Sequence, residues 1–155
     1  MITLKEGDKA PAFAAKDQND RDISLNMFRG KKVALYFYPK DDTPGCTAQA
    51  CNLRDNYSAL LQQGYVVIGV SADDVNSHKK FESKFKLPFP LVADDKQVIS
   101  QEYGVWGEKQ MFGKKFMGIT RTTFLIDEEG KIKKVINKPD TEHHAEQVME
   151  AWEKL

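Results

Sequence analysis

Cysteine is scarce in this sequence. Only Cys46 and Cys51 occur among 155 residues, which is too few to close a structural zinc site by themselves. The three histidines, His78, His143 and His144, lie at no finger-like spacing from the cysteines. Reducing compartments disfavour structural disulfides, so a single cysteine pair in such a setting indicates redox chemistry or metal binding.

Long apolar runs and an excess of one charge are also missing. No uninterrupted apolar run approaches the ~20 residues that a membrane span needs. The charged N-terminus, Met-Ile-Thr-Leu-Lys-Glu-Gly-Asp, lacks the apolar core of a signal peptide. The 23 basic and 23 acidic residues cancel, so charge gives no reason to expect a nucleic-acid partner. We therefore expect a cytoplasmic protein that binds neither membrane nor nucleic acid.

The remaining composition is that of an ordinary globular protein. Hydrophobic residues make up 41% and charged residues 30%, and 155 residues suit one domain with a sizeable core. No linker, internal repeat or low-complexity stretch divides the chain. Residues 1–155 are therefore expected to form a single domain.

Short apolar runs alternate with helical patterns along the chain. Strands are predicted at 32–38, 65–72, 88–93, 122–127 and 131–136. Helices are predicted at 48–63, 75–85, 96–103 and 141–155, with Gly64 and Gly104 ending two of them and Thr141 capping the last. Strand–helix–strand repetition implies parallel pairing, and the last two strands read as a hairpin around a turn that contains glycine. The expected fold class is α/β, with a mixed central sheet flanked by helices.

Cys46 lies where a helix should begin. Pro44 suits the first turn of a helix, because its missing N–H would have no partner there, and Thr43 is then a natural N-cap. Cys46 would lie beside unpaired N–H groups and the positive end of the helix dipole. An ordinary cysteine is only ~3% ionised at pH 7, and helix N-termini favour the thiolate. The position therefore suits a thiolate that attacks a disulfide or a peroxide.

Cys51 follows five residues later. In an intact α-helix this separation corresponds to a Cα–Cα distance of ~8.6 Å, beyond the ~7 Å limit for a disulfide. Cys46 and Cys51 can therefore be bridged only if their helix opens. Taken alone, Cys51 is interpreted as a small apolar core residue. A Cys-x-x-Cys pair, which lies within one helical turn, is absent, and this argues against a thiol–disulfide oxidoreductase.

The residues around Cys46 resemble a known signature. Pro39-Lys-Asp-Asp-Thr43-Pro-Gly-Cys46 is similar to the peroxiredoxin motif, in which a proline and then a threonine precede the peroxidatic cysteine. Its extension, Thr-Ala-Gln-Ala-Cys51, resembles the bacterioferritin comigratory protein subgroup, also called peroxiredoxin Q. The stretch from Tyr103 to Asp127 resembles the same subgroup. The likeness runs over nearly the whole chain, and its motifs are highly specific.

The resemblance implies a thioredoxin-like fold and thiol-dependent reduction of hydrogen peroxide and organic hydroperoxides. It implies that Cys46 attacks the peroxide and that Cys51 resolves the sulfenic acid as an intramolecular disulfide. Arg121 and Thr43 are then assigned to the peroxide pocket, with Pro39 shielding the thiolate. No metal or bound cofactor is implied. Thioredoxin or a similar dithiol is the implied reductant, and the chain is expected as a monomer or a weak dimer.

Arginine chemistry fits this assignment. A guanidinium stays charged at any working pH and carries several fixed donors. Beside Cys46, Arg121 would stabilise the thiolate and the negative charge that develops on the leaving oxygen. A solvated surface position for Arg121 is the alternative reading. Two other functions also stay open, namely a thiol–disulfide oxidoreductase and a non-enzymatic redox-sensing protein that uses the same cysteines as a switch.

Four further features are given no catalytic role. The His143-His144 pair is interpreted as a solvated helix start, and Asp41-Asp42 as turn chemistry. Asn19-Asp20 stands where members of the resembled family often have a glycine turn in an N-terminal hairpin. The apolar stretch 111–117 is either core or a loop near the pocket that meets substrate or reductase.

Overall fold

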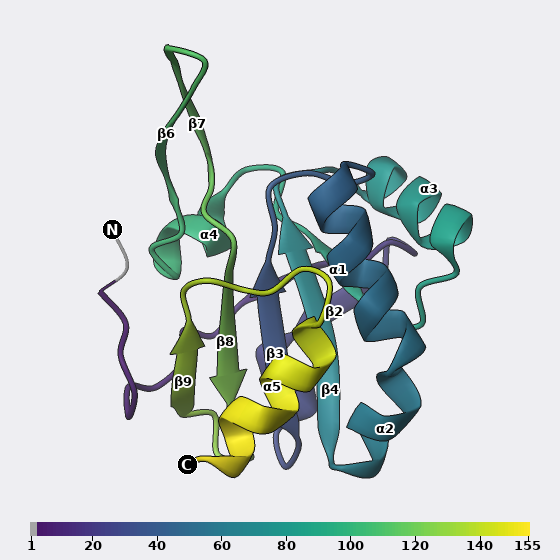
Figure 1. Cartoon of the computed structure of the whole chain (residues 1–155), viewed down its shortest axis with the longest axis vertical. Helices are drawn as coiled ribbons and strands as arrows, with labels where there is room; N and C mark the ends of the chain where they lie inside the picture. Colours follow the sequence, from purple (N-terminus) through teal and green to yellow (C-terminus); the bar gives the residue numbers. More distant parts are fainter. Residues whose placement is uncertain (1–2) are drawn as a thin grey trace.

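The computed structural model describes residues 3–155. Within that range, seven strands form one sheet in the order β2-β1-β5-β4-β3-β8-β9 (Figure 1). Their bounds are β1 Ala14–Lys16, β2 Asp22–Ser24, β3 Lys32–Phe37, β4 Tyr65–Ser71, β5 Leu91–Ala93, β8 Thr122–Ile126 and β9 Ile132–Ile136. The helices are η1 Leu25–Phe28, α1 Pro44–Asp55, α2 Tyr57–Gln62, α3 Val75–Phe85, α4 Val98–Glu102 and α5 His144–Glu153.

The predicted mixed sheet is confirmed. Strand β4 runs parallel to both of its neighbours, β3 and β5, because helices carry the chain back between these strands. Strand β8 pairs antiparallel with β3, and the β8–β9 hairpin turns at Gly130, whose φ of +84° suits glycine. The N-terminal hairpin β1–β2 is also confirmed, and Asp20 takes the left-handed conformation there with φ of +59°.

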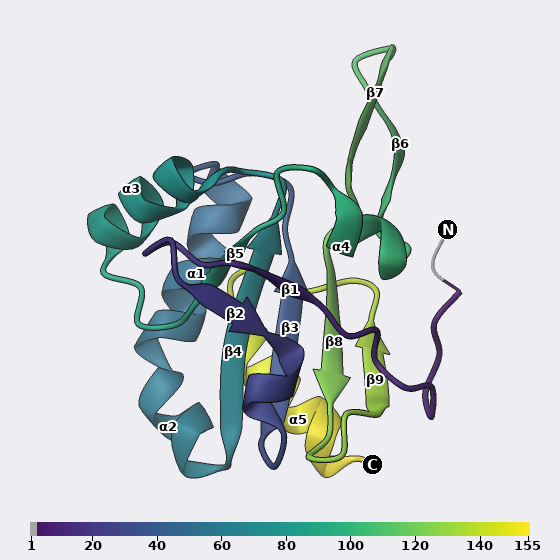
Figure 2. The ribbon, with the colours of Figure 1, turned by 180° about the vertical axis from the view of Figure 1, so that it is seen from behind.

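Strand β3 separates two apolar cores. Its side chains alternate between the sheet's faces, so Val33, Leu35 and Phe37 enter one core while Ala34 and Tyr36 enter the other. The second core packs under α1, α2 and α5, which cover the face seen in Figure 1. The N-terminal strands and α4 lie on the opposite face in Figure 2. Both faces are therefore covered, and the carboxyl end of β3 leads into the turn that precedes α1.

The prediction of one continuous helix at 48–63 is wrong. Helix α1 begins at Pro44, as the Thr43-Pro44 pair indicated, and ends before Asn56, after which α2 begins at Tyr57. The Asn56 side-chain amide donates to the Asn52 carbonyl at 2.8 Å and so competes with the backbone for helical partners. The interpretation of the stretch 111–117 as core is wrong, and a role of this stretch in meeting substrate or reductase stays a prediction. It forms an antiparallel hairpin of β6 (Trp106–Met111) and β7 (Lys114–Ile119).

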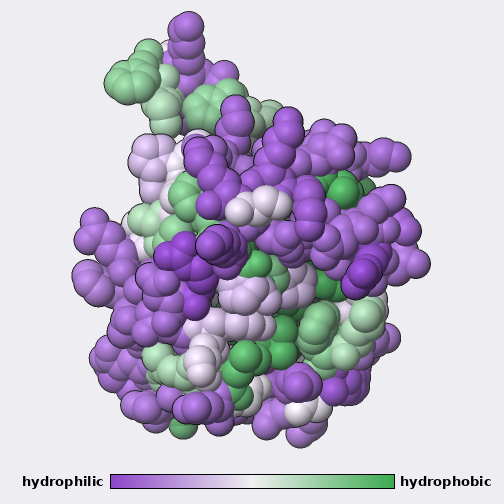
Figure 3. Space-filling view, turned by 90° about the vertical axis from the view of Figure 1, so that its right-hand side faces the viewer, coloured by the Kyte–Doolittle hydropathy of each residue, from purple (hydrophilic) through white to green (hydrophobic). Residues whose placement is uncertain are grey.

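The β6–β7 hairpin projects from the body of the molecule (Figures 1 and 2). Its tip carries apolar side chains, visible as a green cluster at the top of Figure 3. The exposed large side chains there are Met111, Phe112, Phe116 and Met117. These residues are therefore not core.

The predicted start of the last helix is also wrong. Helix α5 begins at His144 rather than Thr141, because the Asp140 carboxylate accepts the backbone N–H groups of Glu142 and His143 and holds 140–143 as a turn. The interpretation of both histidines as solvated fails for His144, which is fully buried. Across residues 3–155, no helix combines the length and apolarity that crossing a membrane requires.

Candidate active site

Cys46 lies in the first turn of α1, as the sequence predicts. Thr43 is the N-cap residue with extended backbone angles, and Pro44 occupies the first helical position. The Thr47 N–H donates to the Thr43 carbonyl at 2.8 Å and starts the helical ladder. Cys46 is 2% exposed and packs in the core beneath α1. Its sulfur therefore meets the unpaired N–H end of the helix in a largely water-free setting.

The Thr43 side chain does not cap the helix. Its hydroxyl donates instead to the Lys40 carbonyl at 2.9 Å, within the turn that precedes α1. The hydrogen of Thr43 is thereby used, while the lone pairs of its oxygen remain able to accept. Pro39 lies at the start of this turn, directly after the buried Tyr38, and is half-buried.

Arg121 lies beside Cys46. Its Nη2 donates to the Cys46 Sγ at 3.3 Å, and its Nη1 donates to Gln49 Oε1 at 2.6 Å. Arg121 leads into β8, next to the carboxyl end of β3, so sheet pairing brings it to the helix start from 75 residues away. A Cβ at Gly45 would stand 3.2 Å from Arg121 Nη2. Gly45 therefore lets the guanidinium approach the helix closely.

Cys51 lies on the same unbroken helix as Cys46, and both are free thiols. Cys51 is half-buried. The predicted arrangement of both cysteines in one helix is thus confirmed, and a disulfide between them requires α1 to open.

Gln49 is a site residue that the sequence reasoning missed. It lies three residues after Cys46, so both side chains share one face of α1, and it is fully buried. Its Oε1 holds Arg121, while its Nε2 has no hydrogen-bond partner among the described residues. The buried Tyr36 hydroxyl also has no hydrogen-bond partner among the described residues. Burial, and then the negative charge of Asp41, raise the pKa of Tyr36. A glutamine at helical spacing from the cysteine was the available signal.

Lys109 was missed as well. Its side chain crosses Gly118, and its Nζ donates to the Ile119 carbonyl at 2.9 Å, two residues before Arg121. Burial, and then the positive charge of Arg121, lower the pKa of Lys109. The base of the hairpin thus brings a second cation toward the site.

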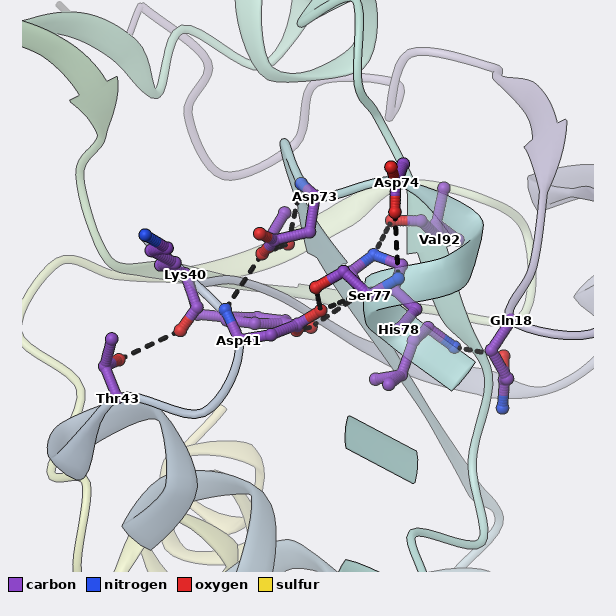
Figure 4. A network of polar contacts seen from close by, with 12 residues as sticks. Gln18, Lys40, Asp41, Thr43, Asp73, Asp74, Ser77, His78 and Val92 are labelled. Atoms are coloured by element: carbon purple, nitrogen blue, oxygen red, sulfur yellow. Dashed lines mark hydrogen bonds and ion pairs between the residues drawn. The ribbon is translucent and has the colours of Figure 1, made fainter. Parts of the chain in front are cut away.

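Asp41 is more than a turn residue, contrary to the sequence interpretation. Its carboxylate accepts the Tyr38 hydroxyl at 2.6 Å and the Ser77 hydroxyl at 2.8 Å, and it pairs with His78 at 2.7 Å (Figure 4). Its backbone N–H donates to Asp73 at 2.9 Å. Asp42 is exposed, with φ of +57°. A buried network therefore anchors the turn that joins β3 to α1.

Several known proteins are similar to this chain in sequence and in fold. The AhpC/TSA family matches residues 6–135. A putative peroxiredoxin bcp from Coxiella burnetii is 47% identical over 96% of this chain and 98% of its own length. Peroxiredoxin Bcp from Bacillus subtilis is 41% identical over 96% and 95%.

The fold comparison agrees with the sequence comparison. A solved structure of Xanthomonas campestris bacterioferritin comigratory protein, studied for its alkyl peroxide reduction activity, has a TM-score of 0.89. It is 30% identical and covers 99% of this chain and 98% of its own. The expected thioredoxin-like fold is thereby confirmed. With Cys46 at the helix start and relatives of this similarity over almost its full length, the chain belongs to the AhpC/TSA family as a Bcp-type peroxiredoxin, a thiol peroxidase.

Proposed function

We propose that this peroxiredoxin reduces hydrogen peroxide and organic hydroperoxides, with Cys46 as attacking thiolate and Cys51 as resolving thiol. The contact that carries the proposal is the 3.3 Å hydrogen bond from Arg121 Nη2 to Cys46 Sγ. A cation held there favours the thiolate and is ready to stabilise negative charge on a neighbouring oxygen. The Xanthomonas campestris relative, studied for alkyl peroxide reduction, supports organic substrates.

In the first step, the Cys46 thiolate attacks the terminal oxygen of ROOH. A sulfur–oxygen bond forms, the O–O bond breaks, and the alkoxide RO⁻ leaves and takes up a proton as ROH. The product on Cys46 is a sulfenic acid. Arg121 is proposed to stabilise the departing oxygen, and the free lone pairs of Thr43 to accept the peroxide O–H. Pro39 is proposed to shield the thiolate from water.

In the second step, the Cys51 thiol condenses with the Cys46 sulfenic acid. A disulfide forms and one water molecule leaves. An external dithiol then exchanges with this disulfide, so that both cysteines return to thiols and the donor is oxidised. Thioredoxin or a similar dithiol protein is the proposed donor, and the cytoplasm, which keeps thiols reduced, is the proposed compartment. A monomer, with a weak dimer as the alternative, stays the predicted assembly.

The test is NADPH consumption in a mixture of this protein, thioredoxin, thioredoxin reductase and peroxide. Wild-type protein should consume NADPH in proportion to added peroxide, and Cys46→Ser should consume none above the blank. Consumption driven by a disulfide substrate but not by peroxide would instead indicate a thiol–disulfide oxidoreductase. Near wild-type activity in Cys46→Ser would contradict the assignment of the attacking residue.

A further inference from the structure

A buried ion pair lies behind the turn that leads into α1 (Figure 4). His78 Nδ1 and Asp41 Oδ2 are 2.7 Å apart, and their side chains are 0% and 4% exposed. His78 comes from α3, whereas Asp41 belongs to the turn after β3. The pair therefore joins two segments that are 37 residues apart in the sequence.

Both ring nitrogens of His78 face acceptors. Nδ1 faces the Asp41 carboxylate, and Nε2 lies 2.9 Å from the Val92 carbonyl oxygen. A carbonyl only accepts, so Nε2 carries a hydrogen, and an ionised Asp41 requires a second hydrogen on Nδ1. Burial lowers the pKa of His78, but the hydrogen bond and charge of Asp41 outweigh it and raise this pKa above its ordinary value. The two acceptors therefore favour an imidazolium, the form of the ring that carries a hydrogen on both nitrogens.

The same residues also have the spacing of a metal cluster. Ligand atoms of Asp41, Asp73 and His78 lie within 4.8 Å of one another. Neither nitrogen of the imidazolium has a lone pair to offer, however, and Asp73 Oδ2 already accepts the Ser71 hydroxyl at 2.6 Å. The arrangement is therefore a hydrogen-bonded charge network whose donors hold the carboxylates in place.

This network controls where the turn lies. Asp41 stands two residues after Pro39 and two before Thr43, and the Thr43 hydroxyl is bonded back to Lys40. A shift of Asp41 therefore moves both ends of the turn. Each end belongs to the proposed peroxide pocket around Cys46, whereas the sulfur itself is carried by α1 and held by Arg121.

We propose that the ion pair between His78 and Asp41 positions the turn 39–43 against Cys46 for the attack on peroxide. The inference rests on the proposed function and adds two positioning residues to it. A displacement of about 1 Å in a positioned site costs up to ~100-fold in rate. Alkylation of the thiolate by iodoacetamide needs no peroxide pocket, so it should be insensitive to the same displacement.

The experiment compares two substitutions of His78 that differ in which hydrogen bond they keep. The Gln amide nitrogen in His78→Gln can reach the Nε2 position and keep the Val92 bond, but it leaves Asp41 without its partner. The shorter His78→Asn places its amide nitrogen near Nδ1 and keeps a neutral bond to Asp41. Second-order rate constants are measured for folded, fully reduced protein with hydrogen peroxide and, separately, with iodoacetamide. Urea unfolding of each variant records stability independently.

We expect His78→Gln to react with peroxide ~10- to 100-fold more slowly, while its iodoacetamide constant changes less than about 2-fold. His78→Asn should recover part of the loss. Lys84→Ala is the matched control, because it removes an exposed ion pair between the same helix and the same turn, at Asp42. Its two constants should equal those of wild type.

If His78→Gln does not fold, His78→Asn carries the test, since it replaces the ion pair by a neutral hydrogen bond to Asp41. A fall of ~3- to 10-fold with peroxide alone is expected. Equal peroxide constants in wild type and the folded variant would overturn the inference, as would parallel losses with both reagents. A wild-type protein that fails to reduce peroxide would instead overturn the proposed function.

Discussion

The two segments that flank Cys46 are held in opposite ways. The turn 39–43 ahead of it is tied to α3 through a buried carboxylate that takes three side-chain contacts. Helix α1, which follows the turn, buries little apolar surface against the core. Within α1, which the structure describes throughout, the buried apolar side chains are Cys46, Ala50 and Leu53, and only Leu53 is large.

This difference matches two demands of the chemistry. Peroxide attack needs a fixed pocket, whereas the disulfide needs a helix that opens, because an intact helix keeps the two Cα atoms ~8.6 Å apart. Segments with little buried apolar surface open at the low end of a protein's stability range. We therefore expect the turn before Cys46 to stay fixed and the helix that follows to open.

The largest effect is expected from removing the Cys51 thiol, because α1 must open only for the Cys46–Cys51 disulfide to form. Cys51→Ser should react once with peroxide per Cys46 and then stop at the sulfenic acid, so turnover with thioredoxin falls sharply. Trapping with a sulfenic-acid reagent, followed by intact-protein mass measurement, gives the stoichiometry. Under excess peroxide, the trapped species should advance to sulfinic acid. Sustained wild-type turnover in this variant would mean that Cys51 is not the resolving thiol.

Removing Arg121, whose side chain joins the start of β8 to α1, should have the next largest effect. Arg121→Ala takes away the donor to Cys46 and the partner of Gln49, and loss of one such electrostatic donor typically slows attack by ~100-fold or more. Iodoacetamide reactivity measured against pH should also shift its midpoint to higher pH. Gln49→Ala is the informative control, because it keeps the Arg121 guanidinium but removes the side chain that holds it. Its rate of peroxide attack should fall less than that of Arg121→Ala. An unchanged titration in Arg121→Ala would remove that residue from the site.

The comparison also extends to two buried histidines. His78 faces the Asp41 carboxylate, whereas His144 begins α5, against which α1 packs, and faces no carboxylate. Burial lowers the pKa of His144 to about 4, since its partners are the Thr123 hydroxyl and the Gln147 amide rather than a carboxylate. The partner, more than the burial, decides the charge.

Stability should therefore fall at both ends of the pH range. The folded pKa of His144 is depressed, so its contribution is present above pH ~6.5 and roughly 3 kcal/mol of it is lost as the pH falls toward 4. The folded pKa of His78, which faces Asp41, Asp73 and Tyr38, is raised. Its contribution is full below pH ~6.5 and is lost as the pH rises through that raised value.

Urea unfolding across this pH range separates the two histidines. His144→Gln should flatten the acid limb, and His78→Asn should flatten the limb at higher pH. Both limbs unchanged in these variants would show that other groups control the pH dependence.

A smaller effect with two opposing parts is expected at Gly45. Gly45→Ala should stabilise α1 by up to ~1 kcal/mol, because alanine favours the helix. Its Cβ would meet Arg121 Nη2 at 3.2 Å, so the guanidinium must shift by a few tenths of an ångström and peroxide attack should slow. Unfolding midpoints and peroxide rate constants measured on one preparation would show both parts. Faster attack in the stabilised variant would contradict the close-approach role.

The position of Cys46 at a helix start could be predicted from the sequence because the relevant signals are local. Pro44 and Thr43 mark a helix start, and five residues to Cys51 set a distance. Arg121 could be placed beside Cys46 only through the family resemblance, since that contact depends on how β8 pairs with β3. Local patterns did not reveal the partners of Asp41 and His144, because those partners come from distant elements. The β6–β7 hairpin was missed because its tip packs against nothing that would impose a burial pattern.

Amide hydrogen exchange on the reduced and disulfide forms would compare the turn and the helix around Cys46 in one experiment. We expect residues 46–54 to lose protection on oxidation, because the Cys46–Cys51 disulfide opens α1. Protection within β3 and β4 and at the Asp41 N–H, which is bonded to Asp73, should stay unchanged. Equal protection of residues 46–54 in both forms, or opening of the turn together with the helix, would contradict a rigid turn and an opening helix on either side of Cys46.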